Sequence, residues 1–110
     1  MICDFGDVAV VPFPFVDMAV SKHRPALVLS TEAFNSNNDN TLFAMITTAK
    51  RSGWPSDVAI VDGATAGLIH QSYVRWKVFT LPNELIRRTA GALGERDRAA
   101  VAAALRKVLP

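Results

Sequence analysis

Short apolar segments separated by turn residues run through most of the chain and constrain its fold more than any other feature. They occupy residues 8–13, 26–30, 42–48, 58–61, 74–81 and 86–93. Segments of this length, rich in β-branched and aromatic residues, are typical of strands. Residues 95–109 carry the pattern of a longer helix, with acidic residues early and basic residues late, and residues 82–85 are predicted to form one helical turn. The succession predicts a small, mainly β, α+β barrel that ends in a C-terminal helix.

Length and hydropathy predict one domain that associates with a second copy. The 110 residues suffice for a single globular domain, residues 1–110, with one modest core. A mean hydropathy of +0.20 is high for so short a chain, so we expect a homodimer to cover part of the apolar surface. Twelve Lys and Arg against ten Asp and Glu leave a net charge of +2, which by itself does not indicate nucleic-acid binding.

Cysteine and histidine usage argues against metal and redox chemistry. A single cysteine, Cys3, excludes an internal disulfide framework, and the two histidines, His23 and His70, lie far apart in the sequence. We therefore expect no cofactor and no metal. No apolar run approaches the ~20 residues that span a bilayer, and the N-terminus lacks the pattern of a signal peptide. A cytoplasmic location without membrane contact is the expectation.

A basic segment that turns into a strand places one arginine in a defined position. Pro25 fixes its own φ and biases Arg24 toward an extended backbone at the mouth of the strand. A guanidinium held there can meet a phosphate with its planar fork of donors. The next apolar segment ends in Thr47, and consecutive strands are usually neighbours. Arg24 and Thr47 are therefore predicted to share one rim, although a threonine also simply suits a strand end.

The ordered set of motifs resembles the MazF/PemK-like toxins of bacterial type II toxin-antitoxin systems. The matching pieces are Gly6-Asp7, residues 12–15, Ser21-Lys22, residues 24–30, residues 46–48, residues 88–93 and the closing helix. This resemblance spans nearly the whole chain and implies an SH3-like barrel of the PemK and CcdB type. It also implies a metal-independent, sequence-selective endoribonuclease, an mRNA interferase that cuts single-stranded RNA and leaves 2′,3′-cyclic phosphate and 5′-hydroxyl ends. The implied partners are RNA, a cognate antitoxin and a second copy, with DNA contacted only through the antitoxin complex.

The same resemblance assigns roles to the residues of the rim. Arg24 would stabilise charge on the phosphate, and Thr47 would donate a hydrogen bond to it. His23 is a candidate proton carrier because an unperturbed imidazole has a pKa near ~6.5, but an idle loop histidine is the alternative. The family's acidic residue is missing from residues 74–81, so no general base is assigned.

Cations next to aromatic rings are the further candidates for RNA binding. A loop with Lys50, Arg51 and Trp54 pairs charge with a stacking ring, although such a tryptophan often seals the edge of a core. Strand alternation sets Arg75 and Lys77 on one face with aromatic rings, where Arg75 is either a second cation or merely solvated. The complete set is Lys22, His23, Lys50, Arg51, Trp54, Arg75 and Lys77.

Two longer connections between the predicted strands are expected at residues 16–23 and 31–40. Residues 16–23 form a loop that either contacts a partner or base or folds over the core. Residues 31–40 read as a turn followed by an exposed, asparagine-rich connection.

The alternatives to a ribonuclease are a protein-directed toxin of the gyrase-poison type and a non-catalytic dimeric RNA-binding module of the same fold.

Overall fold

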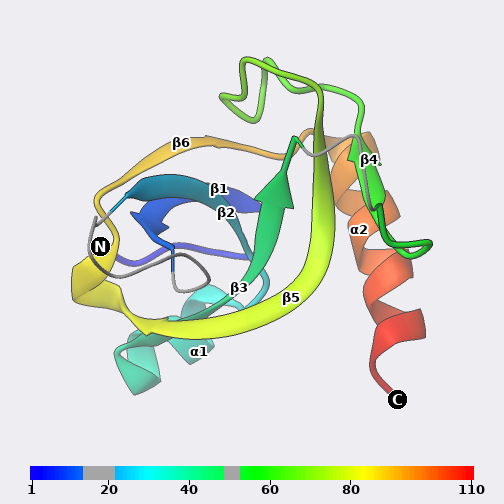
Figure 1. Ribbon diagram of the computed structural model, residues 1–110. Helices are drawn as coiled ribbons and strands as arrows, with labels where there is room; N and C mark the ends of the chain where they lie inside the picture. The colour runs from blue at the N-terminus through cyan, green and yellow to red at the C-terminus, as the bar shows by residue number, and fades with distance from the viewer. Residues whose placement is uncertain (14–21, 49–52) are drawn as a thin grey trace.

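A computed structural model describes residues 1–13, 22–48 and 53–110. Six antiparallel strands form one curled sheet in the order β4-β5-β3-β2-β1-β6, a half-barrel with two helices (Figure 1). The predicted small, mainly β barrel with a C-terminal helix is thereby confirmed. The elements are β1 (Asp7–Pro12), β2 (His23–Val28), α1 (Glu32–Asn38), β3 (Asn40–Thr47), β4 (Val58–Ile60), β5 (Ser72–Pro82), η1 (Asn83–Leu85), β6 (Arg88–Ala92) and α2 (Glu95–Val108).

The sheet buries apolar side chains on both of its faces. On one face Val8 and Leu27 pack in a cluster with Val101 of α2. On the other face Ala9 packs in a second cluster with Phe43, inside the curl of the sheet. Because successive residues of a strand point to opposite faces, this double burial explains why the apolar segments of the sequence are almost continuous.

Strand β2 begins three residues earlier than the sequence indicates. Its pairing with β1 continues from Ala26 back to His23, and Arg24 lies opposite Val11. The pairing of β2 with β3 begins only at Ala26, directly after Pro25. Proline has no N–H to donate, so it is tolerated where the ladder to the next strand stops. Arg24 is therefore a strand residue with extended backbone, as its position before Pro25 predicts.

The predicted connection at residues 31–40 is wrong in part, because helix α1 occupies most of it. Thr31 caps the helix by accepting a hydrogen bond from the Phe34 backbone N–H at 3.3 Å, and Asp39 ends it with a φ of +52°. Asn35 is fully buried and donates to the Cys3 carbonyl at 2.9 Å. The turn chemistry of the segment thus serves as helix caps, and most of the helix is exposed as expected.

The connection between β4 and β5 closes the open side of the sheet against β6. The Ala92 N–H donates to the Thr65 carbonyl at 3.3 Å. Gly67 has a φ of +75°, and a Cβ there would lie 2.6 Å from the carbonyl carbon of Ala90. Only glycine permits both this backbone conformation and this close approach, so the sequence at this point is set by the closure of the barrel.

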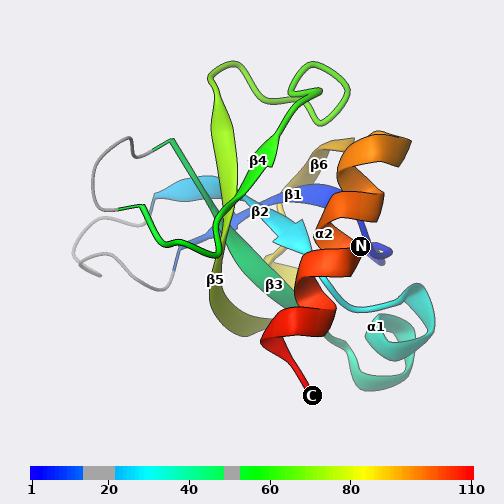
Figure 2. The same cartoon turned by 90° about the vertical axis from the view of Figure 1, so that its right-hand side faces the viewer.

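Helix α2 covers one face of the sheet beside β4 (Figure 2). Its buried residue Asp97 accepts hydrogen bonds from the backbone N–H groups of Val61 at 2.9 Å and Asp62 at 2.8 Å. These bonds tie the start of the closing connection to the helix. Within the described ranges, no helix has the length and apolar character needed to cross a membrane.

Candidate functional site

Arg24 extends from β2 over a layer of aromatic rings. Its guanidinium carbon lies 5.7 Å from the centroid of the Phe13 ring. Phe13 meets Phe79 edge to face at 6.1 Å, and Phe79 stacks on Phe43 at 5.4 Å. A cation over a ring is held electrostatically while its N–H groups stay available at the edge. The Arg24 side chain is exposed, so an anionic ligand can reach it.

Thr47 ends β3 at the same rim of the sheet. It pairs with Tyr73 of β5 and is nearly buried, with 9% of its surface exposed. β2 and β3 pair from Ala26 opposite Met45, and the ladder stops there, two residues short of Arg24 and Thr47. Directly opposite residues of antiparallel strands point to the same face, and side chains alternate along each strand, so Arg24 and Thr47 lie on the same face of the sheet. The shared rim stays a prediction, and this placement is compatible with it.

Arg75 forms a bidentate ion pair with a carboxylate that the sequence analysis missed. Its Nε donates to Oδ1 of Asp57 at 3.1 Å, and its Nη2 donates to Oδ2 at 2.8 Å. The exposed fractions of the two side chains are only 8% for Arg75 and 13% for Asp57. The solvated alternative for Arg75 is therefore wrong. Sequence alone offered a weak signal for Asp57, its place in the turn after Trp54-Pro55.

Trp54 stands beside this ion pair and is 39% exposed. The Arg75 guanidinium carbon lies 5.7 Å from the centroid of the indole, and the Lys77 ammonium lies 6.0 Å from it. The described cations beside this ring come from β5, whereas the cations predicted beside it, Lys50 and Arg51, lie outside the described residues. The other tryptophan, Trp76, is buried and donates its indole N–H to the Ser56 carbonyl at 2.9 Å.

The ion pair also decides what Asp57 can do chemically. Hydrogen bonding from the Arg75 guanidinium lowers the pKa of the Asp57 carboxyl below its usual range. The same bonds raise the pKa of Arg75. A carboxylate with both oxygens engaged and a depressed pKa is a poor proton acceptor near neutral pH. Asp57 thus does not replace the acidic residue that the sequence lacks in β5.

The remaining predicted residues divide into those that the structure describes and those that it does not. Lys22 and His23 are exposed next to Arg24, and the Lys22 carbonyl accepts from the Phe13 N–H at 3.2 Å. Lys50 and Arg51 lie outside the described residues, as does most of the loop predicted at residues 16–23. Within the described ranges, no three His, Cys, Asp or Glu side chains are placed to hold a metal ion.

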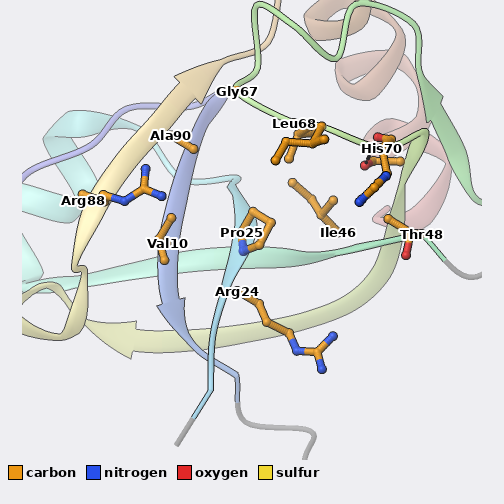
Figure 3. Close-up of a pocket in the computed structure, with 12 residues that line it drawn as sticks. Val10, Arg24, Pro25, Ile46, Thr48, Gly67, Leu68, His70, Arg88 and Ala90 are labelled. Atoms are coloured by element: carbon orange, nitrogen blue, oxygen red, sulfur yellow. Dashed lines mark hydrogen bonds between the residues drawn. The ribbon is translucent and has the colours of Figure 1, made fainter.

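A pocket of about 300 Å³ lies between the sheet and the closing connection. Its apolar lining includes Val10, Pro25 and Ile46, while His70 and Arg88 stand at its margins (Figure 3). Arg24 is also among the residues that line this pocket, and its guanidinium extends away from the apolar side chains, so the pocket and the Arg24 rim adjoin each other. His70 and Arg88 were not predicted as site residues, because only the folding of the closing connection against β6 places both of them on one pocket.

Comparisons with known proteins agree with this architecture. A family model described as PemK-like, MazF-like toxin of type II toxin-antitoxin system matches residues 4–109. MazF from a MazE-MazF crystal structure of Deinococcus radiodurans superposes with a TM-score of 0.78 at 21% identity, covering 99% of this chain and 97% of that one. No curated protein matches the chain.

Two mycobacterial structures have the same fold. An endoribonuclease in complex with its cognate antitoxin from a mycobacterial species gives a TM-score of 0.76 at 18% identity, covering 98% of this chain and 93% of that one. Mycobacterium tuberculosis toxin MazF-mt6 gives 0.73 at 26% identity, covering 92% and 93%. The match of a family model to nearly all of the sequence goes beyond similarity of fold, and the chain belongs to the PemK-like, MazF-like toxins of type II toxin-antitoxin systems.

Proposed function

We propose that the protein is a metal-independent endoribonuclease that cleaves single-stranded RNA with sequence selectivity. The proposal rests on Arg24 near the start of β2 and Thr47 at the end of β3, because these neighbouring strands pair from Ala26 opposite Met45 and the exposed Lys22 and His23 lie next to Arg24. Membership of the toxin family supports it, as does the similar fold of a mycobacterial endoribonuclease. Contact of the protein with DNA is proposed only through a complex with an antitoxin.

The chemistry that suits this rim uses the RNA as its own nucleophile. The 2′-hydroxyl oxygen loses its proton and bonds to the adjacent phosphorus, and the bond from phosphorus to O5′ breaks. The leaving O5′ takes up a proton, so the products are a 2′,3′-cyclic phosphate and a 5′-hydroxyl. Arg24 donates to the phosphoryl oxygens, where negative charge develops, and Thr47 donates its hydroxyl to the same phosphate.

Proton transfer is assigned to His23 rather than to a carboxylate. Arg24 is assigned to charge stabilisation, because a guanidinium group offers donors and no acceptor. Asp57 has both oxygens bonded to Arg75. His23 is exposed next to Arg24, and an imidazole can both accept and donate a proton. An unchanged rate of cleavage by His23→Gln would rule this role out.

Binding of the RNA strand is assigned to the cations and the exposed ring around the rim. Lys22, His23, Trp54, Arg75 and Lys77 are the described members of this set. Lys50 and Arg51, which lie outside the described residues, remain predicted members. Single strands are usually held by such a combination of positive charge and stacking rings.

Two protein partners are proposed as well. A cognate antitoxin would inhibit the protein by laying a flexible segment over the rim, as disordered inhibitors do. A second copy would cover the apolar pocket between the sheet and the closing connection. Ile69, whose surface is 92% exposed, stands at this pocket and provides an apolar contact. We place the protein in the cytoplasm, where RNA and the antitoxin are synthesised.

The test is incubation of the purified protein with a mixed-sequence RNA in EDTA, followed by analysis of the product ends. We expect cleavage with 2′,3′-cyclic phosphate and 5′-hydroxyl ends, and none with Arg24→Ala or Thr47→Ala. Cleavage that requires added metal would contradict the mechanism. Binding without cleavage would instead favour a non-catalytic module, and trapping of gyrase on DNA without RNA cleavage would favour a gyrase poison.

A further inference from the structure

One connected unit contains Asp57, Arg75 and Trp54. Within it Arg75 is paired with a carboxylate, so it differs from a cation that binds phosphate. Both Asp57 oxygens accept from Arg75, at 3.1 and 2.8 Å, in the fork geometry that arginine uses toward phosphate. The pair is largely withdrawn from solvent. Its opposite charges cancel, and the edge of the guanidinium that would grip a phosphate is already occupied. Arg75 is thus poorly suited to anchor the RNA backbone.

The same carboxylate fixes the exposed tryptophan. Oδ2 of Asp57 accepts from the Trp54 backbone N–H at 3.0 Å, and the Asp57 N–H donates to the Trp54 carbonyl at 2.9 Å. The Arg75 guanidinium lies near the indole. Trp54 therefore keeps 39% of its surface exposed while its backbone is held by a closed turn and its ring by a paired cation. A ring fixed before binding loses little conformational freedom when a ligand stacks on it.

The position of this unit connects it to the proposed cleavage site. Arg75 lies opposite Met45 in β3, two residues before Thr47 on the same face of the strand. Diagonal neighbours in an antiparallel sheet lie about 7–8 Å apart. The exposed indole therefore belongs to the surface next to the phosphate position defined by Arg24 and Thr47.

We infer that Trp54 is the stacking surface for one RNA base beside the cleaved phosphate, and that Asp57 and Arg75 form a charge-neutral support that positions it. The inference rests on the proposed RNA substrate and deepens it, since it assigns recognition of a base to Trp54 and withdraws Arg75 from phosphate binding. Asp57 and Arg75 are positioning residues in this arrangement. Every base can stack on such a ring, so stacking distinguishes between bases only by its strength.

The first measurement is tryptophan fluorescence during titration with 2′-deoxy oligonucleotides, which bind without being cleaved. We expect an oligonucleotide with bases to quench the emission and an abasic strand of the same length to leave it unchanged. Trp54→Leu should remove the quenching and weaken binding by about 10-fold, within the range for the loss of one stacked base. Because the other tryptophan is buried, equal quenching in Trp54→Leu would overturn the assignment.

The second measurement is the salt dependence of binding, which separates a support from a phosphate contact. Each phosphate contact with a single strand contributes about 0.7 to the slope of log K against log salt concentration. The double variant Asp57→Asn with Arg75→Gln removes both charges while keeping polar partners, so it should fold and leave the slope unchanged. A slope whose magnitude is smaller by about 0.7 would show that Arg75 contacts a phosphate, and it would overturn the inference.

Two controls keep this test separate from the test of cleavage. Arg106→Gln removes an exposed cation near the end of α2 and should alter neither quenching nor slope. Asp57→Asn alone breaks the neutral pair. It should weaken the quenching, and it should make the salt dependence of binding steeper because Arg75 becomes available to phosphate. If RNA is not cleaved in EDTA but quenching depends on bases and on Trp54, the proposed function fails while the stacking surface stands. If RNA is cleaved in EDTA but its binding does not depend on Trp54, the proposed function stands and the stacking surface fails.

Discussion

The guanidinium of Arg24 lies over the ring of Phe13, with 5.7 Å between the guanidinium carbon and the ring centroid. Phe13 is itself buried, with 6% of its surface exposed, and belongs to the aromatic layer inside the curled sheet. The contact therefore joins an exposed cation to the rigid interior of the barrel. A flat, delocalised cation suits this position better than an ammonium group does.

Replacement of Arg24 by lysine should separate charge from geometry. Arg24→Lys keeps the positive charge but loses the planar fork, so single-turnover RNA cleavage should fall by about 10²–10³, equivalent to ~3–4 kcal/mol. Binding of a 2′-deoxy analogue should fall much less, because several cations share it. Arg106→Lys on α2 is the matched control and should cleave normally. Near-normal cleavage by Arg24→Lys would remove Arg24 from the chemistry.

The Asp57–Arg75 pair should appear in the pH dependence of stability. Because the pKa of Asp57 is lowered in the folded protein, its ionised form stabilises the fold above the unfolded pKa of about 4. This contribution is lost as the pH falls through the lower, folded pKa. As the pH falls below the unfolded pKa, Asp57→Asn should therefore lose less free energy of unfolding than the wild type, as measured by urea denaturation.

Other carboxylates with a lowered pKa also contribute to the loss of stability in acid. The Thr65 hydroxyl lowers the pKa of Asp62, and the Glu32 backbone N–H lowers the pKa of Asp4, so some acid sensitivity remains in Asp57→Asn. Glu84→Gln, at an exposed carboxylate, should follow the wild-type curve. An acid profile of Asp57→Asn that coincides with the wild type would mean that the ion pair contributes nothing to stability.

Asp97 should be among the least replaceable polar residues of the described fold. Asp97→Ala leaves two backbone N–H groups, those of Val61 and Asp62, without their acceptor. An unpaired N–H group costs about 1–3 kcal/mol when it is fully buried, and because these two hydrogen bonds are only partly buried we expect a total loss of about 1–3 kcal/mol in denaturant unfolding. Asp97→Asn retains one acceptor and should lose less. Glu95→Ala, exposed in the same turn, is the control, and equal midpoints for both alanine variants would refute the prediction.

Gly67 should tolerate no side chain. Gly67→Ala combines a positive φ with a collision against the Ala90 carbonyl, so the closing connection must move away from β6. The backbone conformation alone costs about 1–3 kcal/mol for a residue with a Cβ. Gly63→Ala is the control in the same connection, since its nearest neighbour, the Leu68 carbonyl oxygen, is 3.5 Å away. Thermal unfolding of the two variants at the same temperature would contradict this account.

The proposed dimer should depend on the apolar pocket. Sedimentation at micromolar concentration should give a species of twice the chain mass of 11.9 kDa. Ile69→Lys places a charge at the pocket and should shift the protein toward the monomer. Val61→Lys changes a residue that is 59% exposed outside this lining and should leave the dimer intact. A wild-type protein that sediments only as a monomer would refute the dimer itself.

Local sequence signals predicted the central strands well because these apolar segments are covered on both faces. They also predicted that the strands carrying Arg24 and Thr47 are neighbours, which requires only that consecutive strands pair. Helix α1 was missed because part of its support is distant, including the bond from buried Asn35 to the Cys3 carbonyl. The pairing of Arg75 with Asp57 depends in the same way on where the turn before β4 falls against β5.

The pairing of β1 with β6 joins the first and last strands, with Asp7 opposite Ala92. Contacts between such distant parts of a chain form late and slow folding, because a long loop must close first. A chain whose synthesis has not reached Arg88 leaves one side of β1 as an open edge, and β1 is the strand that supports β2 and Arg24. We expect the nascent polypeptide to remain harmless on the ribosome until translation is almost complete.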